Sequence, residues 1–361
     1  MENTNLLYHA DAFPVFQNHM YNNKEAAINC PKGSIRLVQD LETGLIYNSA
    51  FRPELMIYDE NYENEQAVSE IFQKHLESIS KIISSYLGTT NIVEVGCGKG
   101  YFLETLAENG FSITGFDPAY AGSNPRIKKE YFGPASFEKA SGIILRHVLE
   151  HIQNPIDFLE KLKHSNNGRG KIYIEVPCFD WICKRKAWFD IYYEHVNYFR
   201  ISDFNRIFGE VIESGYCFGE QYLYVVAELG SLKIPVIDNF EDRVNLPCDF
   251  TDTIQNRTEQ NRTEQNRTEQ NRTVIWGGAS KGVIFALLKS RAGQLANNII
   301  DINPAKQGKF IAGTGLEIKS PAQGLLELKE GDTIFIMNSN YLDEIKNMTD
   351  NKYKYITVDS A

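Results

Sequence analysis

The stretch that decides the fold is Ile92-Val93-Glu94-Val95-Gly96-Cys97-Gly98-Lys99-Gly100. Its first four residues predict a buried strand, and the residues that follow, 101–109, predict a helix. The glycines between them let the backbone turn tightly and approach a ligand beneath the amino end of that helix. The sequence therefore predicts a ligand-binding turn in an α/β domain.

The ligand predicted for this turn is an adenosine compound. A dinucleotide fingerprint needs a third glycine at position 101, but this residue is Tyr101, which argues against NAD at this turn. Asp117 stands 17 residues beyond Gly100, at the end of the next predicted strand, where a carboxylate can accept both hydroxyls of a ribose.

The rest of the chain alternates strands and helices, which indicates parallel sheets covered on both faces. Four domain ranges are expected. They are an amino-terminal segment with a small hairpin (1–62), a first α/β domain (63–230), a linker (231–273) and a second, smaller α/β domain (274–361). The expected elements are a helix over 68–87, strands at 92–95, 112–116, 143–145, 171–176, 274–276, 298–302 and 333–337, helices at 101–109 and 155–163, and hairpin strands at 35–38 and 45–47.

The predicted linker contains a pentapeptide array. Gln255-Asn256-Arg257-Thr258 is followed by three copies of Glu-Gln-Asn-Arg-Thr that end at Thr273. The array has no hydrophobic residue, so we expect a solvated spacer and no contribution to a core.

Composition limits the partners. The chain of 361 residues carries 47 acidic and 37 basic side chains, a formal charge of −10, which argues against nucleic acid. It has no apolar run of membrane-spanning length and no signal peptide, so we expect a cytoplasmic protein, monomeric or homodimeric. The six cysteines are scattered without a C-x-x-C pair, so we expect free thiols and no metal site.

The two motifs resemble those of class I S-adenosylmethionine-dependent methyltransferases: Glu94 to Gly100, and Gly115-Phe116-Asp117. The resemblance implies a Rossmann-like domain with a mostly parallel seven-stranded sheet, and S-adenosylmethionine as the cofactor. It also implies the cofactor-binding residues: Glu94, Gly96, Cys97, Gly98 and Gly100 along the methionine part, Asp117 with Pro118 at the ribose, Ala135 near the adenine and His147 near the sulfonium.

A segment of aromatic and ionisable residues, 188–199, follows the strand at 171–176 and lies where it can cover the methyl donor. Because imidazole titrates near neutrality, His195 can act as a base, and the neighbouring Glu194 carboxylate can orient the imidazole and stabilise its cation. This segment, together with Gly277 to Gly282 and Asp301 to Gly308, is similar to the sugar C-methyltransferases of deoxysugar biosynthesis, whose second domain is also Rossmann-like.

The similarity implies catalytic roles for Tyr192, Glu194 and His195, with His195 as general base. We also expect Tyr198 and Lys281 to contact the substrate. Two features depart from the family. Cys30 is the only cysteine in the first 90 residues, so the zinc ligands of the family's amino-terminal domain are absent. In addition, Tyr193 stands where many relatives have His.

The expected function is methylation of a nucleotide-activated sugar, on carbon next to a keto group, on nitrogen or on oxygen, for surface polysaccharide such as lipopolysaccharide or for natural products. Two alternatives stay open. Gly277-x-Ala279-x-x-Gly282 with Asp301 is close to a dinucleotide fingerprint, which favours an NAD(P)-dependent sugar oxidoreductase. The other is a non-catalytic binding or scaffold protein in which the array sets the domain spacing.

Overall fold

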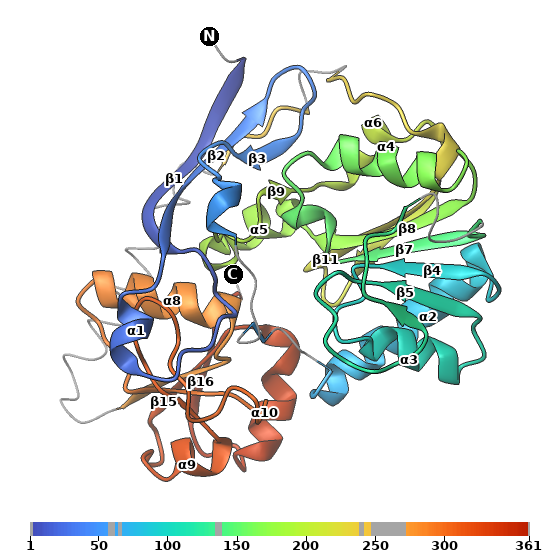
Figure 1. Ribbon diagram of the computed structural model, residues 1–361. Helices are drawn as coiled ribbons and strands as arrows, with labels where there is room; N and C mark the ends of the chain where they lie inside the picture. Colours follow the sequence, from blue (N-terminus) through green and yellow to red (C-terminus); the bar gives the residue numbers. More distant parts are fainter. Residues whose placement is uncertain are drawn as a thin grey trace.

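Three β-sheets organise the chain in the computed structural model (Figure 1). The structure describes residues 3–56, 62–63, 67–133, 139–237, 242–246 and 272–359. The sheets have four, seven and five strands and belong to the amino-terminal segment, the central domain and the carboxyl-terminal domain. The expected α/β class is confirmed, with a second, smaller α/β domain.

The central domain is built on a seven-stranded sheet with the order β10-β11-β8-β7-β4-β5-β6. Among the described strands of this sheet, β11 runs opposite to the other six, so the sheet is mostly parallel, as expected. The strands are β4 (Ile92–Val95), β5 (Ile113–Phe116), β6 (Ile127–Lys128), β7 (Gly142–Arg146), β8 (Lys171–Pro177), β10 (Val211–Cys217) and β11 (Tyr222–Glu228).

Helices cover both faces of this sheet, and each face has its own core. On one face, α2 (Glu70–Leu87) and α3 (Tyr101–Glu108) pack with Ile92 and Ile113. On the other, α4 (Pro155–Ser165) and α6 (Ile201–Ile207) pack with Val93 and Ile172 (Figure 1). The remaining elements are α5 (Phe179–Arg185) and the 3₁₀ turns η2 (Leu149–His151), η3 (Trp188–Asp190) and η4 (Leu229–Ser231).

The amino-terminal sheet joins two distant parts of the chain. The predicted hairpin is confirmed by β2 (Lys32–Asp40) and β3 (Ile46–Asn48), which pair antiparallel. Two further strands were not predicted: β1 (Thr4–Pro14) pairs with β2, and β9 (Asn197–Tyr198) pairs with β3. Because β9 belongs to the 188–199 segment, this sheet holds that segment against the amino terminus. The amino-terminal segment also contains α1 (Lys24–Ile28) and η1 (Pro53–Leu55).

The carboxyl-terminal domain has a fully parallel sheet with the order β14-β13-β12-β15-β16. Its elements are β12 (Thr273–Trp276), α8 (Ser280–Arg291), β13 (Asn298–Ile300), β14 (Ile318–Lys319), α9 (Pro321–Leu325), β15 (Thr333–Ile336), η6 (Ser339–Tyr341), α10 (Leu342–Met348) and β16 (Lys354–Thr357). The strand order reverses at β12, and ligands of open α/β sheets bind at such a switch point.

Most of the pentapeptide array lies outside the described residues, as do Ala135 and Cys248. One expectation about the array is wrong: its last residue, Thr273, is buried as the first residue of β12. The five described cysteines are free thiols, as expected. Within the described ranges, no helix has the length and apolar character needed to cross a membrane.

Candidate active site

The glycine turn after β4 has the geometry that the sequence predicted. Gly96 and Gly100 have φ angles of 74° and 87°, which L side chains rarely adopt. A Cβ atom at Gly96 would stand 2.5 Å from Val148 Cγ2, and one at Gly100 would stand 2.3 Å from Ile127 Cδ1. The Gly98 amide donates to Asp117 Oδ2 at 2.8 Å, so the turn and the carboxylate after β5 lie together.

Glu94 lies in β4, two residues before Gly96. The side chain is buried, and its Oε2 has no hydrogen-bond partner among the described residues. Burial raises the pKa of Glu94 to about 8; the Asp117 and Glu175 carboxylates add to this rise, and Arg146 opposes it. A buried carboxylate oxygen without a partner fits a ligand that brings a cationic donor.

Glu175, near the end of β8, is the hub of a buried network. It accepts from Arg146, His147 and His75 at 3.1 Å each and from the Tyr173 hydroxyl at 2.8 Å. Although burial opposes its charge, Arg146 and the histidines hold the pKa of Glu175 well below its usual range.

His147, at the end of β7, is the predicted neighbour of the sulfonium and is partly exposed to a cavity. Burial opposes a charge on its ring, but the carboxylates of Glu150 and Glu175 raise the pKa of His147 to about 9. The imidazole is therefore a cation at neutral pH.

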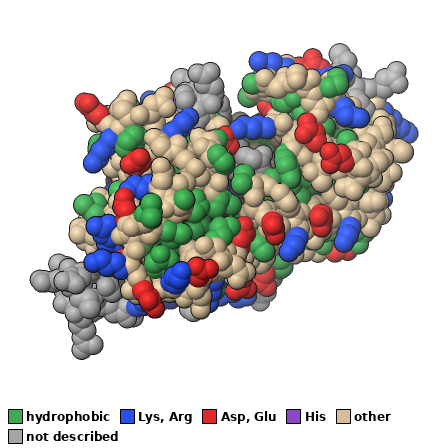
Figure 2. Space-filling view, turned by 90° about the horizontal axis from the view of Figure 1, so that it is seen from below, with side chains coloured by type: hydrophobic (Ala, Val, Ile, Leu, Met, Phe, Trp, Pro, Cys, Tyr) green, Lys and Arg blue, Asp and Glu red, His purple; other side chains and the backbone are tan. Residues whose placement is uncertain are grey.

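That cavity, of about 240 Å³, lies where the central and carboxyl-terminal domains meet. The carboxyl ends of β7 and β8 face those of β12 and β15 across it, and hydrophobic side chains gather on the lobe of the carboxyl-terminal domain (Figure 2). Its polar lining comes from all three parts of the chain: Asn18, Tyr62, Ser69, His147, Glu150, His151, Asp190, Tyr192, Glu194, His195, Tyr222, Ser280, Lys281, Asp301, Asn303, Lys306, Asn338, Tyr341 and Glu344.

The structure brings Tyr192 and His195 together in this cavity. The Tyr192 hydroxyl lies 3.0 Å from His195 Nε2, and the two ring centroids are 4.2 Å apart. Burial, together with the positive charges of His151, His147 and Lys281, lowers the pKa of His195 well below its usual range. The imidazole is therefore uncharged at neutral pH and able to accept a proton.

Glu194 also lines the cavity, but its carboxylate points to other partners. It accepts from the backbone amides of Gln17 and Asn18 and from the Tyr62 hydroxyl at 2.7 Å. Within the described residues, no hydrogen bond joins this carboxylate to the His195 ring. Through these contacts, Glu194 attaches the amino-terminal segment to the 188–199 segment.

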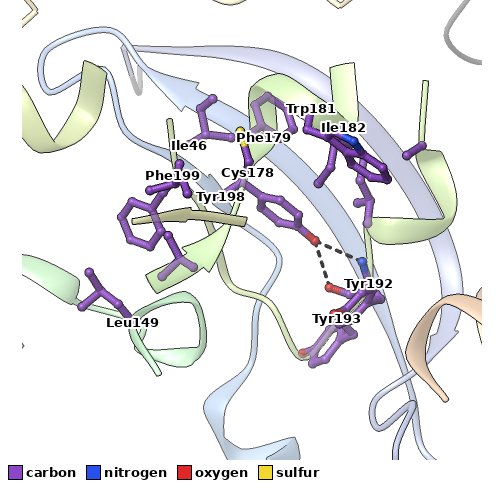
Figure 3. Close-up of a cluster of buried hydrophobic side chains, with 14 of the residues drawn as sticks. Ile46, Leu149, Cys178, Phe179, Trp181, Ile182, Tyr192, Tyr193, Tyr198 and Phe199 are labelled. Carbon is purple, nitrogen blue, oxygen red and sulfur yellow. Dashed lines mark hydrogen bonds between the residues drawn. The ribbon is translucent and has the colours of Figure 1, made fainter. Parts of the chain in front are cut away.

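The structure does not bring Tyr198 into the cavity lining. Its hydroxyl accepts from the Tyr192 backbone amide at 3.0 Å and donates to the Tyr192 carbonyl oxygen at 3.1 Å (Figure 3). Because both functions of the hydroxyl are used inside the core, we assign Tyr198 to holding Tyr192 rather than to substrate contact.

Lys281, which was expected to contact the substrate, lies in the cavity lining at the start of α8. Its Nζ donates to Gln221 Oε1 at 2.7 Å, lies 3.1 Å from Asp190 Oδ2, and stands over the Trp181 ring. These contacts connect the carboxyl-terminal domain to the central domain and fix the ammonium at the cavity wall.

Residues 56–211 match the family model described as a methyltransferase domain. This segment is a methyltransferase domain. The expected enzyme class, an S-adenosylmethionine-dependent methyltransferase, is confirmed, and so is the cofactor. No curated protein matches the chain.

Solved structures similar to the methyltransferase domain cover just under half of the chain. The magnesium protoporphyrin IX methyltransferase of Synechocystis PCC 6803 with bound S-adenosylhomocysteine has 16% identity and a TM-score of 0.34, covering 46% of this chain and 89% of its own. The N-methyltransferase NodS of Bradyrhizobium japonicum has 17% identity and a TM-score of 0.31, covering 44% and 94%. A methyltransferase of Archaeoglobus fulgidus has 16% identity and a TM-score of 0.32, covering 44% and 100%.

The methyltransferase domain offers S-adenosylmethionine a fitting site. Glu94 presents a buried carboxylate oxygen without a partner, the glycine turn leaves no room for side chains at Gly96 and Gly100, and Asp117 lies beside the turn. The side chain of Cys97 is buried, while Pro118 is exposed next to Asp117. The individual cofactor contacts stay predictions.

Sequence reasoning missed several residues of the cavity. Glu150 and His151 lie in η2, directly after the strand that ends near His147, and their position at the carboxyl end of β7 was a usable signal. Asn18 and Tyr62 had no such signal, because only the long-range contacts with Glu194 bring them to the site.

Proposed function

We propose that the protein methylates a nucleotide-activated sugar for surface polysaccharide or natural-product assembly, with His195 as general base. The acceptor is a carbon next to a keto group, or a nitrogen or oxygen of the sugar. The observation that carries the proposal is the position of His195, a buried and uncharged imidazole that lines the cavity between the methyltransferase domain and a Rossmann-like domain.

Two further features support a nucleotide-linked substrate. The cavity reaches the switch point of the carboxyl-terminal sheet, the position where open α/β sheets bind nucleotides. There Asp301 Oδ2 accepts from the Gly278 amide at 2.8 Å, which repeats the arrangement of Asp117 with Gly98. Asp301 is suited to a ribose, and Lys281 with the amino end of α8 is suited to phosphate.

Each of these residues then has a separate role in the proposed reaction. S-adenosylmethionine supplies the electrophilic methyl group. On a keto-sugar, His195 would remove the proton from the carbon next to the carbonyl and so make that carbon the nucleophile for the methyl group that S-adenosylmethionine would supply. Tyr192 orients the imidazole through the contact between its hydroxyl and His195 Nε2. On a hydroxyl or amino acceptor, His195 takes the proton from oxygen or nitrogen.

The test uses deuterium exchange as well as turnover. The wild-type protein, saturated with S-adenosylhomocysteine, is incubated in D₂O with nucleotide-linked keto-sugars, and exchange at the carbon next to the carbonyl is followed by NMR. We expect exchange in the wild type and a loss of about a hundredfold or more in His195→Ala. The affinity for S-adenosylhomocysteine should stay nearly unchanged.

The control variant is His164→Ala, which removes an exposed imidazole from the end of α4. It should exchange and turn over like the wild type. If His195→Ala exchanged deuterium as fast as the wild type, His195 would not be the general base. Methyl transfer to a keto-sugar without any exchange would place the methyl group on nitrogen or oxygen instead of carbon.

A second candidate function is favoured by the turn at Gly277 to Gly282. Its nearness to a dinucleotide fingerprint keeps an NAD(P)-dependent oxidoreductase reaction in the carboxyl-terminal domain as a hypothesis. Calorimetric titration with NAD and NADPH distinguishes the two, because a nucleotide-sugar site binds the sugar nucleotide and neither dinucleotide.

A further inference from the structure

We propose that Glu150, His151 and His195 form a binding site for a divalent transition-metal ion such as Zn²⁺, and that an ion bound there inhibits methyl transfer. One ligand atom from each residue lies within 4.8 Å of the other two. Two imidazole nitrogens and one carboxylate are a ligand set that suits such ions. The inhibitory part rests on the proposed role of His195 as base.

Glu150 is the strongest single observation. Its side chain is 1% exposed, and neither carboxylate oxygen has a hydrogen-bond partner among the described residues. Its Oε1 makes an ion pair with His147, whose Nδ1 lies 3.4 Å away. Without a hydrogen bond, the burial of this carboxylate is incompletely compensated, and a metal cation bound beside it would lower the remaining cost.

The two histidines present nitrogens toward the same point. His151 Nδ1 donates to the Glu194 carbonyl oxygen at 2.9 Å, and this bond fixes the tautomer that leaves Nε2 with its lone pair. The rings of His151 and His195 meet edge to face, with centroids 4.9 Å apart. Both line the cavity, so an ion can enter from solvent.

A second group of possible ligands shows what a poor site looks like. His75, Glu175 and Cys217 also lie within 4.8 Å of one another. However, Glu175 is already saturated by Arg146, His147 and Tyr173, so an ion there would have to displace three partners. Glu150 has the ion pair with His147 but no hydrogen bond among the described residues that an ion would have to displace.

Inhibition follows from the lone pairs. The ligand atoms of a zinc ion lie about 2 Å from it. Each of the three ligand atoms would therefore have to move by less than about 1 Å toward a common centre to bind one ion. A metal-bound imidazole nitrogen has donated its lone pair and cannot accept a proton. The ion would therefore compete with the proton for His195.

The experiment titrates the full chain, stripped of metal with a chelator, with ZnCl₂ by calorimetry and with Co²⁺ by visible absorption. We expect one ion to bind per chain in the wild type. Affinity should fall by at least about tenfold in Glu150→Gln and in His151→Ala, and stay unchanged in the exposed control His164→Ala. Binding of S-adenosylhomocysteine verifies that each variant is folded.

The outcomes separate this proposal from the proposed function. Equal binding in the wild type and in Glu150→Gln, or no binding at all, would overturn the metal site and leave His195 as base untouched. Site-dependent binding with activity lost on Zn²⁺ addition and restored by chelator supports both parts. Activity that requires the ion would keep the site but overturn both the inhibition and the base role of His195.

Discussion

Binding of the cofactor should be coupled to ionisation of Glu94. The Glu94 carboxyl has a pKa of about 8, so in the free protein it is mostly protonated at pH 7. We expect the α-ammonium of S-adenosylmethionine or S-adenosylhomocysteine to pair with the ionised form of Glu94. Since the carboxyl must first lose its proton, binding at pH 7 should release close to one proton per ligand.

The magnitude follows from the same pKa. Below pH 8 the ionised fraction of Glu94 rises about tenfold per pH unit, so the affinity for S-adenosylhomocysteine should rise nearly tenfold, or about 1.4 kcal/mol, from pH 6 to pH 7. Above about pH 8 the ligand's own amino group loses its proton, and the affinity should fall again. The charged groups that act on Glu94 are Arg146, Asp117 and Glu175.

Calorimetry in buffers with different ionisation enthalpies measures the affinity and the released proton together. Glu94→Gln should lose both the proton release and the rise between pH 6 and 7. The matched control is Glu108→Gln, which neutralises an exposed carboxylate on α3 and should keep both. A wild-type affinity that is flat from pH 6 to 8, with no proton release, would refute the pairing of Glu94 with the ligand.

Ionisation of Glu94 also affects stability without cofactor. Because the folded-state pKa is raised, the folded protein holds a proton that the unfolded chain has lost between about pH 4.5 and 8. Stability should therefore fall as pH rises through this window and level off above about pH 8. Thermal melts of the wild type and Glu94→Gln, compared across the window, measure this contribution.

Three further variants test the framework of the site. Gly100→Ala should lower stability by about 1–3 kcal/mol and weaken cofactor binding, since its Cβ would meet the Ile127 side chain; thermal melts and calorimetry check this. Glu175→Gln should lower the free energy of unfolding by about 3–5 kcal/mol in denaturant titrations, because it leaves Arg146 buried without its counter-charge. Asp117→Ala should reduce S-adenosylhomocysteine affinity at least about tenfold with little change in melting temperature.

The parts of the fold that could be predicted are those with local signals. The strand and turn at 92–100 were recognisable because β-branched residues precede glycines that the positive φ angles require. The helix α2 was recognisable from its apolar spacing, although it begins at Glu70, two residues later than the expected 68, because Ser69 caps it. These features depend on neighbours in sequence, so a single sequence carries them.

The strands β1 and β9 had no such signal. In β1 the residue Ala12 has a positive φ angle and the pairing with β2 shifts register twice, so the alternation of apolar residues is broken. In β9 only two residues pair, and their partner strand β3 lies about 150 residues earlier in the chain. Tertiary contacts alone make these segments strands.

The same distinction explains what could be predicted of the site. Tyr192, Glu194 and His195 were recognisable as a group because they are adjacent in the sequence, but adjacency says nothing about where each side chain points. The imidazole and the phenol face each other, while the Glu194 carboxylate turns to Gln17, Asn18 and Tyr62. Glu194 thereby ties the amino-terminal segment to the base-carrying loop, and Asn18 in turn bonds Ser280 of the carboxyl-terminal domain at 3.0 Å. The cavity is therefore a property of the three parts together, and no one of them contains a complete wall around His195.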